Sequence, residues 1–170
     1  MFREGHLGVT LALSVPIVGV LAAAGHWELA GFVFVIVFAS EPLPDLDSTP
    51  YVSLPHRGPF HSIVFAVGIG LLASTVGFGY GTTFETLSPA VGAALGGFSG
   101  LYGVCTHLFT DTLNPMGVGL FWPVSDRIYH IPEPNGLCEA DNPIANSLFL
   151  FGGILLALIA SLAVALVRLF

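Results

Sequence analysis

The sequence predicts an all-α fold, a polytopic membrane helical bundle of about five transmembrane helices in a single domain over residues 1–170. Hydrophobic residues make up 54% of the chain and charged residues only 9%, and the mean hydropathy is +0.86. A soluble domain usually carries about a quarter charged residues, so this chain could not cover a water-facing surface. The apolar runs are continuous and lack the period-two alternation of half-buried strands, which favours helices as the spans.

Five apolar stretches are the candidate helices. A spanning helix needs about 20 apolar residues, and about 17 suffice. The stretches cover approximately residues 7–24, 29–40, 62–78, 89–109 and 144–170. The second stretch is short unless it continues through Glu41 toward Pro42, so we expect it to be tilted or partly shielded by protein. The first has no basic segment before it, and we expect a retained helix rather than a cleaved signal.

Glycines recur every four residues in the fourth stretch, at Gly92, Gly96 and Gly100. Small residues at this spacing form a smooth ridge that lets helices approach closely. We expect this ridge to pack against another helix of the same chain. Homodimerisation through the ridge is the alternative, and it would make the protein a homo-oligomer.

If all five stretches cross the bilayer, they return three polar segments to one face. These segments are residues 1–6, 41–61 and 107–143. Arg3, Arg57 and Arg127 fall on this face, and Arg168 falls on the other. Because an excess of arginine marks the cytoplasmic side, we predict a multi-pass protein of the inner or plasma membrane with this face in the cytoplasm. The net charge of −7 argues against nucleic acid as a partner.

The same topology sorts the histidines and acids. Five of the six histidines and nine of the eleven acids fall on the arginine-rich face, although these residues were not used to draw the helices. Ionisable groups at membrane depth are costly and usually functional. The sorting therefore predicts one functional site at a single face of the bilayer.

His107 and Asp111 lie four residues apart near the end of the fourth stretch. At this spacing both side chains project from one face of a helix. The imidazole and the carboxylate could chelate one divalent cation, while an ion pair or a helix-end cap is the alternative.

Asp45 and Asp47 lie in the segment Pro-Leu-Pro-Asp-Leu-Asp over residues 42–47. Each proline disfavours helix in the residue before it, so we expect extended chain with both aspartates on the same side. An Asx turn that ends the preceding helix is the alternative. Two carboxylates so close repel each other unless a cation or a proton intervenes.

Two further histidines, His56 and His61, flank a Gly-Pro turn before the third stretch. The turn would let both imidazoles converge. Arg57 between them suits an anion contact, because its planar fork matches phosphate or carboxylate; lipid headgroup anchoring is the alternative. We expect Ser62 to cap the third helix. His6 opens the first helix on the same face.

Together these residues predict a metal site. Mixed nitrogen and oxygen ligands without thiolate suit Zn²⁺, Mn²⁺ or iron, and seven candidates would suit one to three ions or one ion with orienting carboxylates. Water on such a metal could attack a phosphoester, with Asp45 or Asp47 as the base and Arg57 as the third catalytic residue. The seven candidate ligands are His6, Asp45, Asp47, His56, His61, His107 and Asp111.

These motifs resemble those of a known family, the membrane-bound metal-dependent hydrolases of the inner membrane protein YdjM type. The resemblance covers about residues 4 to 123. The matching pieces are Glu4-Gly5-His6, Leu43-Pro44-Asp45-Leu46-Asp47, His56-Arg57-Gly58 with His61-Ser62, Thr106-His107 with Asp111, Asn114-Pro115-Met116-Gly117-Val118 and Phe121-Trp122-Pro123. Ser48 departs from the pattern, because the family often has histidine there.

The resemblance implies a hydrolase loosely related to zinc-dependent phospholipase C and P1-type nucleases. It also implies a smaller set of metal ligands than the spacing alone suggests. These are His6, Asp45, His61, His107 and Asp111.

The resulting hypothesis is an integral membrane hydrolase that cleaves a phosphoester, such as a phospholipid, at the bilayer surface. A metal-binding transporter with ligands near mid-membrane is one alternative, and a non-catalytic protein with a structural metal closed by protein ligands is the other. We expect residues 122–143 to form a lid or substrate wall, to which His130 and Glu133 could add site residues. Trp122 suits an interfacial anchor.

Overall fold

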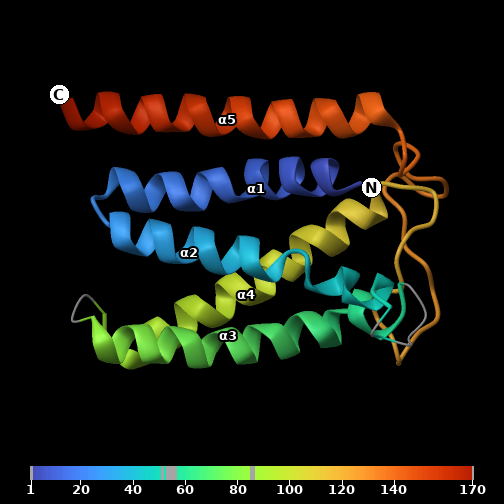
Figure 1. Ribbon diagram of the computed structural model, residues 1–170, viewed down its shortest axis with the longest axis horizontal. Helices are drawn as coiled ribbons and strands as arrows, with labels where there is room; N and C mark the ends of the chain where they lie inside the picture. Colours follow the sequence, from blue (N-terminus) through green and yellow to red (C-terminus); the bar gives the residue numbers. More distant parts are fainter. Residues whose placement is uncertain (1, 51, 53–56, 85–86, 170) are drawn as a thin grey trace.

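The computed structural model describes residues 2–50, 52, 57–84 and 87–169. Within these residues the chain is all-helical, and its only strand-like pairing is an isolated bridge between Val118 and Tyr129. Figure 1 shows the bundle. Its elements are α1 (Arg3–Ala23), α2 (Trp27–Ser40), the 3₁₀ helices η1 (Leu43–Ser48) and η2 (Pro59–His61), α3 (Ile63–Thr83), α4 (Pro89–Thr112) and α5 (Pro143–Leu169). The predicted all-α membrane bundle is confirmed.

Four helices of the described chain are long and apolar enough to cross a bilayer. They are α1, α2 with its η1 continuation (Trp27–Ser48), α3 and α5. The second stretch thus reaches spanning length by continuing past Glu41. The 24-residue α4 would be long enough at about 1.5 Å per residue, but its glycines and its polar last turns lower its hydropathy. It packs against α1, α2 and α3, so protein shields much of it from lipid.

Helices α1, α2, α3 and α5 follow the long axis in alternating directions, and α4 crosses obliquely from α3 toward α1, so the polar segments gather at one end (Figure 1). We call this the polar end; it comprises residues 2–6, 41–50, 57–62 and 107–142. The opposite end holds the α1–α2 turn, the start of α4 and the C-terminal turn of α5. The arrangement agrees with the predicted sorting of polar residues to a single face.

The helices α3 and α4 approach each other at backbone distance. A Cβ atom added to Gly77 would strike the carbonyl of Gly92, and one added to Gly96 would strike the carbonyl of Ala73. A Cβ on Gly100 would likewise meet the side chain of Ala73, at 2.5 Å. The glycine ridge therefore packs inside the bundle, which is the predicted use.

The segment that carries Asp45 and Asp47 is helical rather than extended. Leu43–Ser48 forms a 3₁₀ helix with proline in its first turn, where the missing N–H and the fixed φ of proline are tolerated. The prediction of extended chain was therefore wrong. Residues two apart in a 3₁₀ helix point in directions about 120° apart around its axis, so the two carboxylates leave the helix in different directions.

Candidate metal centre

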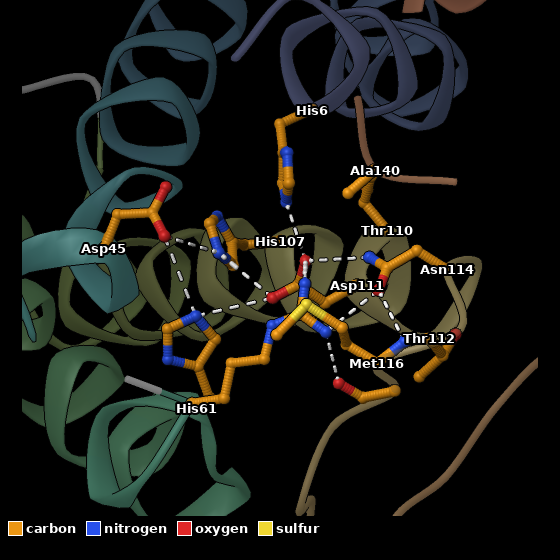
Figure 2. Close-up of polar contacts among 12 residues, drawn as sticks. His6, Asp45, His61, His107, Thr110, Asp111, Thr112, Asn114, Met116 and Ala140 are labelled. Carbon is orange, nitrogen blue, oxygen red and sulfur yellow. Dashed lines mark hydrogen bonds and ion pairs between the residues drawn. The ribbon is translucent and has the colours of Figure 1, made fainter. Parts of the chain in front are cut away.

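Three imidazoles and two carboxylates of the described residues meet at the polar end (Figure 2). They come from five different places in the chain: α1, η1, η2 and two turns of α4. Four of these side chains are almost fully buried, whereas that of Asp45 is 53% exposed. The cluster therefore opens to its surroundings on the Asp45 side. Its members are His6, Asp45, His61, His107 and Asp111.

The facing atoms of the cluster are the histidine Nε2 atoms and the carboxylate oxygens. The Nε2 of His61 lies 3.7 Å from Asp45 Oδ1 and 3.4 Å from Asp111 Oδ2. The Nε2 of His107 lies 3.6 Å and 3.7 Å from the same two oxygens, and that of His6 lies 3.4 Å from Asp111 Oδ1. These separations exceed the 2.7–3.2 Å typical of N–H···O hydrogen bonds. They match the spacing of about 3.4 Å between tetrahedral ligands that lie about 2.1 Å from a metal.

Two of the imidazoles turn their other nitrogen to a buried carboxylate. The Nδ1 of His61 lies 3.0 Å from Asp47 Oδ2, and the Nδ1 of His107 lies 3.4 Å from Glu41 Oε1. Metal-binding histidines almost always donate the second ring N–H to such an oxygen, which fixes the tautomer and the ring orientation. With Nδ1 as the donor, the Nε2 lone pair of each of these two rings faces the centre of the cluster.

The third imidazole is held by the N-terminal backbone. The Nδ1 of His6 lies 3.3 Å from the carbonyl oxygen of Phe2. The Phe2 amide in turn donates to Asn146 Oδ1 at 3.1 Å and to the Ala140 carbonyl at 3.2 Å. The start of α5 thus fixes the start of α1, and with it the ring of His6.

The comparisons with known proteins give one match. The model of the YdjM inner membrane protein family matches residues 1–169. The chain belongs to the YdjM inner membrane protein family. No curated protein and no solved structure matches it. Membership of the family, together with the apolar helices, identifies a multi-pass protein embedded in a lipid bilayer.

Arg57 of this YdjM-family chain turns inward. Its Nη1 donates to Asn114 Oδ1 at 2.9 Å and to the Gly117 carbonyl at 2.6 Å, and its Nη2 donates to Asp111 Oδ1 at 3.0 Å. Its amide donates to Asp47 Oδ2 at 3.0 Å from a left-handed backbone with φ of 61°, a conformation that costs roughly 1–2 kcal/mol in a residue with a Cβ. The local contacts that hold this conformation place the guanidinium beside Asp111 Oδ1, which His6 also faces, and leave Oδ2 for His61 and His107.

Ser62 fixes the position of His61, one residue before it. Its Oγ accepts a hydrogen bond from the Phe65 amide at 3.2 Å and donates to the Pro59 carbonyl at 2.6 Å. The predicted cap of the third helix is confirmed. Because His61 is the last residue of η2 and Ser62 is the N-cap of α3, the cap fixes the backbone from which the imidazole projects.

Glu41 is the residue that sequence reasoning missed. It is only 4% exposed and lies beside His107. A sequence signal was available, since a carboxylate directly after an apolar stretch at membrane depth is usually functional. It is also four residues before Asp45, but the expected extended chain obscured that spacing.

Three other sequence candidates that the structure describes, Asp47, His130 and Glu133, lie outside the cluster. Asp47 Oδ2 contacts the Nδ1 of His61, which lies on the opposite side of the ring from Nε2. His56 lies outside the described residues. In the part of the chain that is described, His130 contacts the Pro115 carbonyl through Nε2 at 3.0 Å. Glu133 lies 3.8 Å from Arg127, so neither of these loop residues joins the cluster.

Proposed function

We propose that this protein is an integral membrane metal-dependent hydrolase that cleaves a phosphoester. The observation that carries the proposal is the convergence of buried histidine Nε2 atoms and carboxylates at spacings that suit a metal. The mixed donor set without thiolate favours Zn²⁺, with Mn²⁺ or Fe²⁺ as alternatives.

The donor set supports a single shared ion. Two groups of ligand atoms each lie within 4.8 Å, one with His6 and Asp111 and one with Asp45 and His61, and His107 belongs to both. Because His107 offers one Nε2, the two groups suit one ion better than two. Four carboxylates surround the rings, including Glu41 and Asp47, against one guanidinium. A divalent cation would offset their mutual repulsion.

The bound metal would lower the pKa of a coordinated water and so supply a nucleophile for the phosphoester. Asp45 is the exposed member of the cluster, so we assign it to the substrate side as a ligand or a general base. Asp47 holds the His61 ring, and Arg57 holds Asp111. We therefore propose positioning roles for these two residues in place of direct contact with substrate.

The position of the cluster suggests a lipid-linked substrate. The residues of the cluster lie at the start of α1, in η1, in η2 and in the last turns of α4, which all belong to the polar end (Figure 1). Phospholipid headgroups would lie at this level of the bilayer. We propose that the polar end faces the cytoplasm, because Arg3 and Arg127 lie at this end and only Arg168 lies at the opposite end. Arg57 adds little to this argument, since its charge is used within the protein.

The direct test pairs metal analysis with hydrolysis by the purified protein. We expect one equivalent of divalent metal, and product release from bis-p-nitrophenyl phosphate or from phospholipid vesicles supplied with Zn²⁺ or Mn²⁺. The variant His107→Ala should lose metal and product release together. Activity that persists in a variant without bound metal would refute the assignment.

A structural metal is the second candidate, because five protein donors could saturate one ion. Replacement of the bound metal by Co²⁺ distinguishes a hydrolytic site from a structural one. A hydrolytic site should change its visible absorption spectrum when phosphate binds, whereas a saturated site should not. The location of the cluster at the polar end disfavours a transporter. Metal flux through the protein in proteoliposomes would make a transporter the better candidate.

A further inference from the structure

A cavity lies toward the opposite end of the bundle, among α1, α2 and α5. Its volume is about 250 Å³ and its wall is mostly apolar. The α1 side runs from Leu11 to Ala22 and the α5 side from Ala157 to Val164, with Trp27 of α2 between them. Helix α5 packs along α1, so the cavity is a groove that follows the helices within the membrane. We call it the α1–α5 groove.

An arginine is held at the mouth of the groove. Arg168 lies one turn beyond Val164 and hence on the same face of α5. Its Nη2 donates to the Ala22 carbonyl at 3.0 Å, and its guanidinium carbon lies 5.8 Å from the centre of the Trp27 ring. Gly25, with φ of +89°, leaves room for it, since a Cβ there would lie 2.6 Å from Nη2. The groove thus ends at a positioned cation.

One residue that lines the groove carries a polar atom without a hydrogen-bond partner among the described residues. The Oγ of Ser14 is buried, and it has no hydrogen-bond partner in the part of the chain that is described. Ser14 lines the groove. Buried polar atoms are rarely left unpaired, so this atom marks a place that the protein does not fill by itself.

We propose that the α1–α5 groove binds one anionic phospholipid, with an acyl chain along the apolar wall and the phosphate on Arg168. The bilayer presents acyl chains at this depth, and an apolar groove there would fill with one. The remaining N–H groups of the Arg168 fork suit a phosphate. The other three arginines lie at the polar end, so the cation and the groove coincide only here. The proposal does not depend on the hydrolase assignment.

A glycine in the groove wall provides a sharp test. Gly19 lines the groove, and a Cβ added to it would meet nothing within 4 Å. The variant Gly19→Leu should therefore occupy the space of the acyl chain without displacing protein atoms. Gly31 of α2 offers the matched control, because a Cβ there also meets nothing within 4 Å and Gly31 does not line the groove.

The experiment is native mass spectrometry of the full chain after reconstitution with equal amounts of phosphatidylglycerol and phosphatidylcholine. We expect one retained lipid, mainly phosphatidylglycerol. Gly19→Leu should lower this retention at least about tenfold, which corresponds to about 1.4 kcal/mol, and Gly31→Leu should leave it unchanged. Arg168→Gln should keep some lipid but lose the preference for phosphatidylglycerol.

Three results would overturn the proposal. One is equal lipid retention by the Gly19→Leu and Gly31→Leu variants. Another is an unchanged preference for phosphatidylglycerol in Arg168→Gln. The third is a wild-type dimer that Gly19→Leu dissociates, because the groove would then hold a second copy of the chain.

Discussion

The two ends of the helical bundle differ in how deeply their ionisable side chains are buried. At the polar end, His61, His107 and Asp111 are almost completely buried and face one another. At the opposite end, His26 and Glu28 are exposed. Burying ionisable groups costs free energy even when they are paired, and the opposite end shows that the bundle folds without such a cluster there. Within the described ranges, the burial of ionisable groups at the polar end alone is what the proposed metal site would explain.

The largest expected effect is a difference in metal affinity between a variant of a histidine at the polar end and a variant of one at the opposite end. His107→Ala removes the Nε2 atom shared by both ligand groups, so we expect metal affinity to fall by more than the roughly 10–100-fold that the loss of an orienting partner causes. Elemental analysis and metal titration of the detergent-purified variants would measure this. His26→Ala is the control and should bind metal like the wild type. Equal affinities in the two variants would remove the distinction between the ends.

The next effect concerns the buried carboxylate that orients His107. Glu41→Gln keeps the shape of the side chain but removes its charge, and we expect metal affinity to fall roughly 10–100-fold. Glu28→Gln, at the exposed opposite end, is the matched control. Competition with a chelating dye measures both variants. If Glu41→Gln retained wild-type affinity, Glu41 would be a structural neighbour of His107 rather than its positioning residue.

A third comparison tests how the half of the bundle toward the opposite end is held together. Gly77→Ala would push a methyl group into the carbonyl of Gly92, and overpacking of this kind typically costs about 1–3 kcal/mol. At Gly79, two residues further along α3, an added Cβ meets nothing within 4 Å. Gly79→Ala should therefore be neutral, or stabilising by up to about 1 kcal/mol through helix propensity.

Thermal unfolding in detergent measures this pair of glycine variants. Metal binding should be unaffected in both, because the cluster lies at the other end of the bundle. A lower midpoint for Gly79→Ala than for Gly77→Ala would contradict the close packing of α3 on α4.

The smallest expected effect is the loss of stability when either of the two serine caps is removed. Ser62 is buried and both accepts and donates hydrogen bonds, whereas Ser88 is exposed and caps α4 by accepting from the Val91 amide at 3.3 Å. Loss of a cap costs about 0.5–2 kcal/mol. We expect Ser62→Ala near the upper limit and Ser88→Ala near the lower one, measured by thermal unfolding. Only Ser62→Ala should also weaken metal binding, since it loosens His61.

The candidate site could be predicted from sequence as a set of residues but not as an arrangement. Seven candidate ligands, Asp47 and His56 among them, were predicted because each lies near a helix end on one side of the membrane. The subset that the structure brings together was implied by the family resemblance; its members are His6, Asp45, His61, His107 and Asp111. The interaction of Asp47 with the His61 Nδ1 and that of Arg57 with Asp111 were not foreseen. Both depend on the turn over residues 57–62 and on η1, where proline patterns permit more than one local structure.

The sequence by itself determined that the chain crosses a bilayer several times and which polar residues share a face. Hydropathy acts over about 20 consecutive residues, so local composition suffices for that. The tertiary structure alone decided which nitrogen of each imidazole faces the centre, that Glu41 supports His107, and that α4 is shielded by its neighbours. These features depend on how each helix is rotated and how closely it packs, and packing joins residues that are far apart in the sequence.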